Sequence, residues 1–326
     1  MLPDSSLLNE ESRAALDLVR ELQNEISAAL MRCPSMVGAD PADIPHIRDC
    51  QARAFYATSG YRRICERYAV TVTREQIGGV ETEIFVPSNG IATKNVGRVL
   101  INLHGGGFQI GSRTISQLES IPIASVGAIK VVSVDYRMAP EYRFPAATKD
   151  AVAVYRALLQ DYAPQNIGIY GCSAGAVLTT ETVALLHRQG LQLPAAIGLL
   201  CGAASYWTEG DSGRLDEALS GTFKGTAQSD PYFRDTETHD ALAFPVQSSE
   251  TLAVFPRSLL ITATRDLALS SVIHTHSCLV RQGVKAYLHV WEGLGHAFHY
   301  FPDLPQSREV YETVVCFFDD HLGTRM

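Results

Sequence analysis

The sequence is poor in features that would point to large or charged partners. Only 19% of its 326 residues are charged, the net charge is -8, and no stretch of five to eight residues is rich in lysine and arginine. Nucleic acids and anionic membrane surfaces attract basic patches, so neither is expected as a partner. No apolar run approaches the ~20 residues that a membrane-spanning helix needs.

The start of the chain and its cysteines show no sign of export. The first 26 residues are acidic and amphipathic, and they lack the basic stretch and the apolar core of a secretory signal. No cysteine belongs to a CxxC pair, and most have apolar neighbours. The seven are Cys33, Cys50, Cys65, Cys172, Cys201, Cys278 and Cys316. We therefore expect reduced, buried thiols and a cytoplasmic location.

Hydrophobic residues make up 46% of the sequence, which is enough for the core of one large domain with an accessory part. The spacing of apolar residues predicts a helix over 5–32 and another over 46–68. Two β-branched runs on either side of Gly78 and Gly79 then predict an antiparallel hairpin.

After the hairpin, the chain alternates between apolar strands and helices. The predicted strands cover 98–103, 129–135, 166–170, 196–201, 257–263 and 285–291, and the predicted helices cover 145–161, 174–189, 270–282 and 305–322. This alternation predicts an α/β fold with a mostly parallel sheet covered on both faces. Residues 203–255 break the alternation and are rich in aromatic side chains, so we expect an inserted cap rather than a structureless loop.

The stretch GCSAG at 171–175 places one serine between two glycines where a strand gives way to a helix. A sharp strand-to-helix turn exposes the serine oxygen at the end of a sheet, and its crowded backbone requires small residues two positions before and after. Ser173 is therefore a candidate nucleophile. Because such a short pattern also occurs in purely structural turns, the surrounding chain has to supply the rest of the chemistry.

A nucleophilic serine needs a histidine base and an acid that orients the base. In this architecture they follow in the order serine, acid, histidine. Asp266 and His296 each come just after a predicted strand, which places them at the same sheet edge as Ser173. His299 is the nearest alternative to His296, and Glu292 is an alternative acid. The other histidines weighed were His104, His187, His274, His276 and His289.

Acyl transfer also needs backbone N–H donors for the oxyanion, one after the nucleophile and one from a loop after an earlier strand. The loop HGGGF at 104–108 provides glycines that let the main chain approach a substrate. An alternative is a degraded dinucleotide-binding loop with Asp135 as the ribose ligand, although the glycine spacing is looser than that motif requires. In the next segment, Arg137 and Glu141 are expected to form a local ion pair.

Together these motifs resemble the bacterial hormone-sensitive-lipase-like carboxylesterases of the α/β-hydrolase superfamily. The matching segments are HGGGF at 104–108, DYRMAPE at 135–141, GCSAG at 171–175, Asp266 and GHAF at 295–298. The resemblance implies that Ser173 is the nucleophile, His296 the base and Asp266 the orienting acid. It also implies an oxyanion hole formed by the N–H groups of Gly105, Gly106 and Ala174.

The resemblance further implies an α/β-hydrolase fold with a helical cap. The cap would comprise 1–68 and 203–255, and the catalytic domain 69–202 and 256–326. Two positions depart from the family pattern: Cys172 stands where an aspartate usually precedes the nucleophile, and DLALSS at 266–271 lacks the usual second acid.

The expected function is hydrolysis of small, short-chain or aromatic carboxylic esters through an acyl-enzyme, with no metal or cofactor. Hydrolysis of amides or lactones by the same residues remains open, as does a non-catalytic receptor that closes over a small molecule. The resemblance also makes a homodimer plausible.

Overall fold

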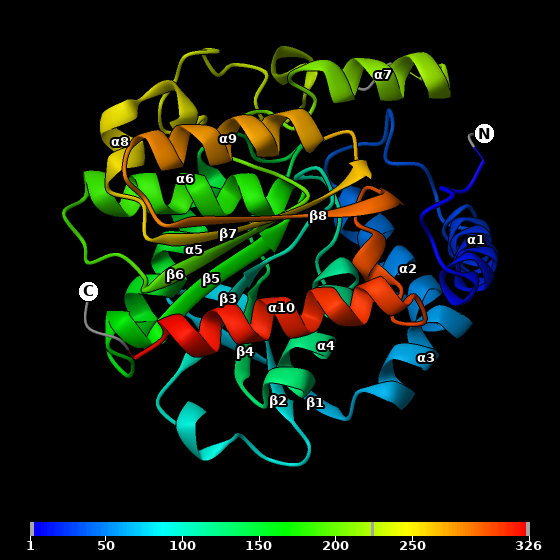
Figure 1. Ribbon diagram of the computed structural model, residues 1–326, viewed down its shortest axis with the longest axis horizontal. Helices are drawn as coiled ribbons and strands as arrows, with labels where there is room; N and C mark the ends of the chain where they lie inside the picture. The colour runs from blue at the N-terminus through cyan, green and yellow to red at the C-terminus, as the bar shows by residue number, and fades with distance from the viewer. Residues whose placement is uncertain (1–2, 223–224, 324–326) are drawn as a thin grey trace.

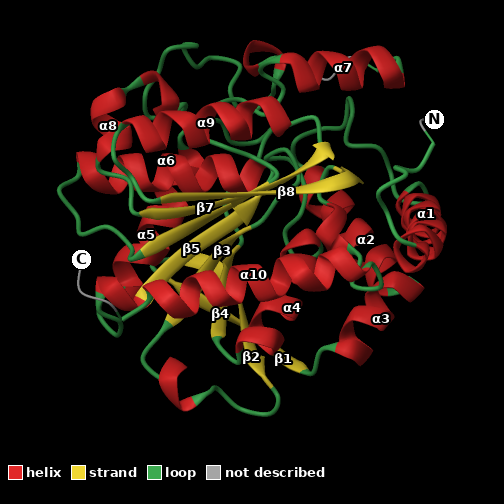
Figure 2. Ribbon diagram, in the orientation of Figure 1, coloured by secondary structure: helices red, strands yellow, loops and turns green. Residues whose placement is uncertain are grey.

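The structure is a computed structural model that describes residues 3–222 and 225–323. At its centre is an eight-stranded sheet with the order β1-β2-β4-β3-β5-β6-β7-β8 (Figures 1 and 2). β1 and β2 form the predicted hairpin, β2 pairs with β4 in antiparallel fashion, and the other neighbouring pairs are parallel. The strands are β1 (Val70–Ile77), β2 (Val80–Pro87), β3 (Val99–Leu103), β4 (Lys130–Val134), β5 (Ile167–Cys172), β6 (Ala196–Leu200), β7 (Arg257–Arg265) and β8 (Ala286–Gly295).

Different helices cover the two faces of the sheet. On one face lie α5 (Ala146–Leu158), α6 (Ala174–Arg188) and α9 (Leu269–Arg281), and on the other lie α4 (Ile115–Gly127) and α10 (Pro305–His321) (Figure 1). The central strands β3 to β6 are buried on both sides, which explains their continuous apolar sequences. α6 is enclosed along almost its whole length, with 13 of its 15 residues buried.

One helix of this arrangement, α4, was not predicted from the sequence. Almost all of its residues are buried, including polar ones such as Gln117 and Glu119, so no exposed polar face marks a helical period. It also contains Pro122, which ordinarily argues against a helix interior. Both features hid a helix that the tertiary packing stabilises.

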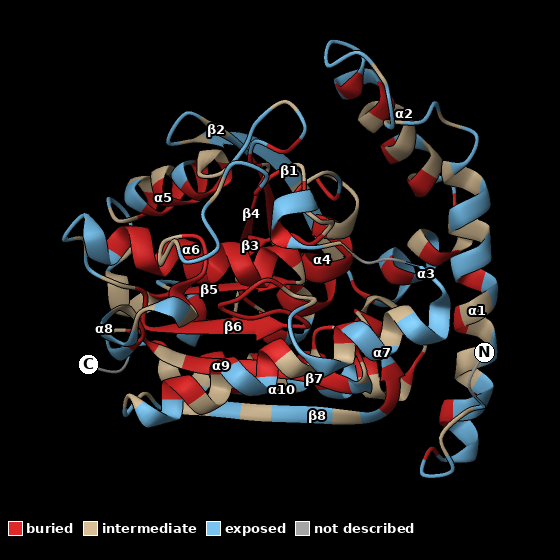
Figure 3. Cartoon of the chain, turned by 90° about the horizontal axis from the view of Figure 1, so that it is seen from above, coloured by how far each residue is buried: buried red, intermediate tan, exposed pale blue. Residues whose placement is uncertain are grey.

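The N-terminal part forms three helices rather than the predicted two. α1 (Glu10–Leu30) confirms the first prediction, but the second predicted helix is divided into α2 (Ile44–Tyr56) and α3 (Ser59–Arg67). The division occurs because Thr58 caps α3, its Oγ1 accepting a hydrogen bond from Tyr61 N at 3.3 Å. These helices lie to one side of the molecule, off the carboxyl ends of the parallel strands (Figures 1 and 3).

The cysteines correct the expectation of uniformly reduced, buried thiols. Cys33 and Cys50 form a disulfide that joins the end of α1 to α2, and Cys65 and Cys316 are exposed. The 17-residue separation and the absence of a motif concealed the pairing, which depends on how α1 and α2 pack. Because disulfides are rare in reducing compartments, the thiol argument for a cytoplasmic location no longer holds, and that location stays a prediction.

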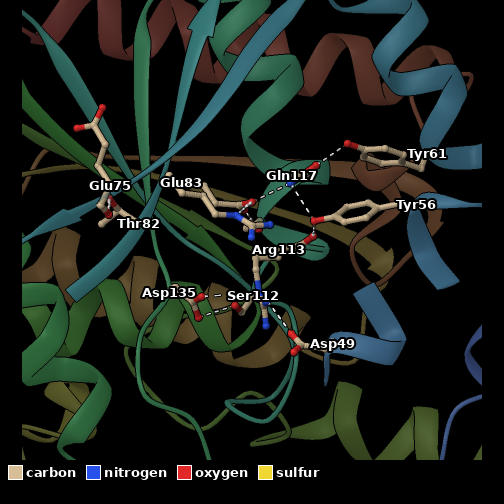
Figure 4. A network of polar contacts seen from close by, with 12 residues as sticks. Asp49, Tyr56, Tyr61, Glu75, Thr82, Glu83, Ser112, Arg113, Gln117 and Asp135 are labelled. Carbon is tan, nitrogen blue, oxygen red and sulfur yellow. Dashed lines mark hydrogen bonds and ion pairs between the residues drawn. The ribbon is translucent and has the colours of Figure 1, made fainter. Parts of the chain in front are cut away.

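A polar network attaches α2 and α3 to the central domain (Figure 4). The Tyr56 hydroxyl donates to Arg113 O at 2.6 Å, and the Tyr61 hydroxyl donates to Gln117 Oε1 at 2.7 Å. The Arg113 guanidinium in turn donates to Asp49 Oδ1 at 2.7 Å. Polar side chains that point toward one another from separate elements thus fix the N-terminal helices in place.

Residues 203–255 carry structure of their own, including α7 (Asp211–Ser220) and α8 (Ser249–Ala253). Aromatic side chains anchor this segment to the core: the Tyr232 ring stacks on Phe108 with centroids 4.1 Å apart, and Phe233 packs against the same Phe108 ring at 5.3 Å. Within the described part of the chain, no helix has both the length and the apolar character to cross a bilayer.

Candidate active site

Ser173 lies at a sharp turn between β5 and α6. Its backbone angles are φ 56° and ψ -121°, a strained region for a residue with a side chain. The flanking glycines are required by space, because a Cβ on Gly171 would lie 2.3 Å from Leu103 O and one on Gly175 would lie 1.7 Å from the same oxygen. The turn therefore holds Ser173 at the carboxyl end of β5.

Asp266 and His296 lie beside Ser173 although both are distant from it in sequence. Asp266 follows β7, and His296 follows β8 directly. His296 Nδ1 lies 2.7 Å from Asp266 Oδ1, and its Nε2 lies 2.9 Å from Ser173 Oγ. With the ring proton on Nδ1, the imidazole donates to the carboxylate and accepts from the serine hydroxyl. The structure thus brings together the three residues that the sequence singled out.

The environment of Asp266 keeps it ionised. Burial raises the pKa of its carboxyl, but His296 and hydrogen bonds from Ala268 N and Thr262 Oγ1, both at 2.9 Å, outweigh burial and hold the pKa below its usual value. The carboxylate is therefore a fixed acceptor that can orient the imidazole and stabilise it when it becomes charged.

The alternative residues do not make these contacts. His299 and His104 are fully buried, and burial lowers their pKa to about 3 and about 4, so both stay neutral at physiological pH. The His104 ring stacks on Tyr136 with centroids 4.2 Å apart, which is a packing role. The alternative acid Glu292 is exposed and accepts a hydrogen bond from Ser5 at 2.7 Å. His187, His274 and His289 are exposed on α6, α9 and β8, and His276 is partly buried on α9.

One of the expected oxyanion donors in the glycine loop already has an acceptor. Gly105 N–H donates to Glu119 Oε1 at 2.9 Å. Within residues 3–222 and 225–323, the N–H groups of Gly106, Gly107 and Ala174 meet no acceptor. Gly107 was not among the expected donors, yet its φ is 60° and the space beside its Cα is open.

Glu119 is a second group near the site that the sequence did not single out. Its carboxylate is buried beneath the glycine loop, and burial raises its pKa to about 7. The only signal in the sequence is an isolated acid within the apolar run from Leu118 to Ala124. A single acid of this kind is ordinarily assigned to an exposed helix face, and only the packing of α4 reveals that it is buried.

The segment after β4 forms different ion pairs from those expected. Arg137 does not pair with Glu141. Instead it donates to Asp150 on α5, with Nη2 2.8 Å from Oδ1, while Glu141 accepts from Arg48 on α2 at 2.6 Å. Partners from other elements outcompete the local pair because they present both carboxylate oxygens to a guanidinium.

The structure shows what surrounds the two positions that depart from the family pattern. Cys172 is fully buried beneath the turn, and burial raises the pKa of its thiol, which argues against a reactive cysteine. Ser270 contacts α7, since its backbone N–H donates to Ser212 Oγ at 2.9 Å and its own Oγ accepts from Ser212 N at 3.0 Å. Ser270, four residues after Asp266, thus ties α7 to α9.

Among the residues that the structure describes, two groups of side chains have the composition of metal ligands. One contains Cys172, Cys201 and His299, and the other contains Cys201 with Asp266 and His296; within each, the ligand atoms lie within 4.8 Å of one another. The second group shares two residues with the serine-centred arrangement, where they are already hydrogen bonded.

Known proteins share sequence and fold with this chain. Residues 100–300 match a family model described as an α/β hydrolase fold. The chain is 30% identical over 230 residues to an acetyl-hydrolase of Streptomyces hygroscopicus, covering 68% of this chain and 75% of that protein. Among solved structures, esterase E25 has a TM-score of 0.80 at 27% identity, covering 99% of this chain and 97% of the other. An esterase of the bacterial hormone-sensitive lipase family has a TM-score of 0.74 at 25% identity, covering 93% and 99%.

Proposed function

Because this chain belongs to the α/β-hydrolase family and to its bacterial hormone-sensitive-lipase-like branch, we propose that it is a serine carboxylesterase acting on small esters. The observation that carries the proposal is the position of His296 between Asp266 Oδ1, at 2.7 Å, and Ser173 Oγ, at 2.9 Å. A hydroxyl, an imidazole and a buried carboxylate in this order form the arrangement that activates a serine.

In the proposed reaction, Ser173 Oγ attacks the ester carbonyl carbon while His296 Nε2 takes the hydroxyl proton. The tetrahedral intermediate collapses when the same Nε2–H protonates the leaving alcohol, and this leaves an acyl-enzyme. A water molecule, deprotonated by His296, then attacks the acyl carbon. The bond to Ser173 Oγ breaks as His296 Nε2–H returns the proton to that oxygen, and the acid is released. Asp266 accepts from Nδ1–H throughout and stabilises the positive imidazolium.

The negative oxygen of each intermediate needs N–H donors. We assign them to Gly106, Gly107 and Ala174, whose N–H groups meet no acceptor in the described part of the chain. Ala174 begins α6, so the positive end of that helix also faces the reacting oxygen. Gly105 is left out of this set because its N–H already donates to Glu119.

We propose that the acyl group is short, because aromatic side chains fill the space next to the glycine loop. Phe108 follows the glycines directly, is fully buried, and packs between Tyr232 and Phe233, with ring centroids 4.1 and 5.3 Å away. We propose that the residues of 1–68 and 203–255 together form the cap over the substrate. The acetyl-hydrolase name of the Streptomyces relative points to the same short acyl class.

A substitution pair tests the proposal. Ser173→Ala should abolish hydrolysis of p-nitrophenyl acetate and labelling by a serine-directed phosphonate, while Cys172→Ala should keep both. An active Ser173→Ala variant would overturn the assignment of the nucleophile. A panel of acetate, butyrate and palmitate esters with matched amides and lactones then defines the substrate, and comparable rates for acetate and palmitate would contradict the short-chain proposal.

A further inference from the structure

We infer that Glu119 is a positioning residue that holds two active-site loops in register beneath Ser173. The two are the oxyanion loop, residues 104–111, and the histidine loop, residues 295–301. This inference rests on the proposed esterase function, because it assigns Glu119 a role in that reaction. Glu119 does not touch the reacting atoms, so its effect is exerted through the residues that it contacts.

One carboxylate oxygen of Glu119 contacts both loops. Its Oε1 accepts from Gly105 N at 2.9 Å in the oxyanion loop and from the Tyr300 hydroxyl at 2.7 Å in the histidine loop. Gly105 directly precedes the proposed donor Gly106, and Tyr300 lies four residues after His296. A shift of this oxygen would therefore displace the oxyanion donors and the base relative to each other.

The second carboxylate oxygen attaches the same residue to the sheet. Glu119 Oε2 accepts from Asn102 Nδ2 at 2.7 Å, and Asn102 Oδ1 accepts from Ser133 Oγ at 2.7 Å. Asn102 lies on β3 and Ser133 on β4, both in the centre of the sheet. Glu119 thus connects two loops to a rigid part of the fold.

The space around Gly105 leaves no room for another arrangement. A Cβ at this position would lie 2.7 Å from the Tyr300 hydroxyl oxygen, 2.9 Å from Cys172 O and 3.3 Å from Glu119 Oε1. The loop is therefore packed between the turn that carries Ser173, the histidine loop and α4. Cys172 provides no carboxylate at the position before the nucleophile, and Glu119 brings one to this junction from α4.

Burying the Glu119 carboxylate costs free energy. Glu119 is 3% exposed, and no described lysine or arginine forms an ion pair with it. An apolar residue of similar size would avoid the cost of removing a carboxylate from water. Its hydrogen bonds from three separate elements indicate that it is kept for the geometry it imposes.

The positioning role of Glu119 should be visible in the pH dependence of kcat. Burial raises its pKa to about 7, and each of the three contacts is a donor to the carboxylate, so protonation weakens the set. The titratable groups that face it are Tyr136, Tyr170, Tyr300 and Cys172, whose pKa values are all raised, so they stay neutral at this pH. We therefore expect kcat to fall as Glu119 takes up a proton below about pH 7.

The experiment compares four variants of the full chain. Glu119→Ala removes all three contacts. Glu119→Gln keeps an acceptor oxygen but does not titrate, and Tyr300→Phe removes a single contact. Glu181→Gln is the matched control, because Glu181 is also a fully buried acid with a raised pKa, yet it lies on α6 and accepts from Thr148. Kinetics use p-nitrophenyl acetate, and melting temperatures report folding.

The expected result is a loss in kcat with little change in KM. Glu119→Ala should lower kcat about 10- to 100-fold, which is the range for a misplaced catalytic group, and should weaken binding of a trifluoromethyl ketone transition-state analogue by a similar factor. Glu119→Gln should recover most of this loss above pH 8, and its kcat should fall less steeply below pH 7 than that of the wild type. Glu181→Gln should match the wild type in kcat.

Several outcomes would overturn the inference. A kcat for Glu119→Ala within twofold of the wild type would do so, as would equal losses in Glu119→Ala and Glu181→Gln that follow only the melting temperature. If Glu119→Ala does not fold, Tyr300→Phe decides, and an unchanged kcat in that variant rejects the role. A wild-type protein that hydrolyses no ester would instead reject the proposed function itself.

Discussion

The guanidinium of Arg48 on α2 donates to both carboxylate oxygens of Glu141, at 2.6 and 2.9 Å. The same side chain also donates to Ala139 O at 2.8 Å and to Gln109 O at 2.9 Å. Arg48 therefore connects an N-terminal helix to the oxyanion loop and to the segment after β4. The side chains of the pair are only 12% and 15% exposed.

Arg48→Ala should destabilise the protein strongly. Removing one partner leaves the Glu141 carboxylate nearly buried without its counter-charge, which costs roughly 3–5 kcal/mol in comparable pairs. Urea denaturation should show this loss in the free energy of unfolding. Arg308→Ala is the control, because its pair with Glu11 is 47% and 69% exposed and should contribute less than about 1 kcal/mol. Equal effects of the two substitutions would contradict the structure.

Asp266→Asn should lower kcat on the order of 10⁴-fold while leaving the protein folded. The amide can donate to the histidine ring and so favours the tautomer that does not accept the Ser173 proton. Thr262→Val removes one hydrogen bond to Asp266 Oδ2 but keeps the carboxylate. The kcat of this variant should therefore fall by less than about 10-fold. Steady-state kinetics with p-nitrophenyl acetate measure both, and a fully active Asp266→Asn variant would reject the assigned acid.

His299 should make the stability of the protein depend on pH. Burial lowers its pKa to about 3, below the ordinary value of about 6.5, so the unfolded chain binds a proton that the folded chain does not. This contribution is complete well above pH 6.5 and declines as pH falls, by about 1.0 kcal/mol between pH 6.5 and 5.5. His299→Phe should therefore be less sensitive to acid than the wild type in urea denaturation at these two values. Parallel curves for the two proteins would argue against a neutral buried imidazole.

Counting the reactive thiols tests the disulfide between Cys33 and Cys50. With one disulfide and five free cysteines, the denatured protein should present five reactive thiols without reductant and all seven after reduction. Closing a loop of this length stabilises a fold by roughly 3 kcal/mol, so Cys33→Ser should lower the melting temperature. The exposed Cys316→Ser should not. Seven reactive thiols before reduction would show that the bond does not form.

Gly175→Ala should disrupt the turn at Ser173. The added Cβ would lie 1.7 Å from Leu103 O, and neither backbone can move without shifting β3 or α6. We expect the free energy of unfolding to fall by more than about 3 kcal/mol. The serine should also no longer react with the phosphonate. Gly97→Ala is the matched control because an added Cβ there meets no atom within 4 Å. Normal labelling of Gly175→Ala would mean that the turn is looser than described.

The elements with a strong local pattern were predicted well from the sequence. The hairpin around Gly78 and Gly79 and the six later strands are present, because apolar runs and turn glycines act over a few residues. Ser173, Asp266 and His296 were found because each follows a strand, and parallel strands bring their carboxyl ends to one edge.

What the sequence concealed depends on contacts between distant segments. The helix α4 has no polar face to reveal its period, and the Cys33–Cys50 pairing depends on the packing of α1 and α2. The engagement of Gly105 N–H by Glu119 and the exchange of partners at Arg137 are likewise set by tertiary structure. The propensity and spacing of residues along the chain do not show which distant residues become partners.

The enclosure of α6 has a consequence for how related proteins diversify. Since thirteen of its fifteen residues are buried, changes of side-chain volume along it would disturb the packing behind Ser173. The surface segment around α7, by contrast, meets α9 through serine hydroxyls and backbone groups. Side chains of a different size should therefore be tolerated more readily around α7 than along α6, so we expect variation among related proteins to concentrate in that surface segment.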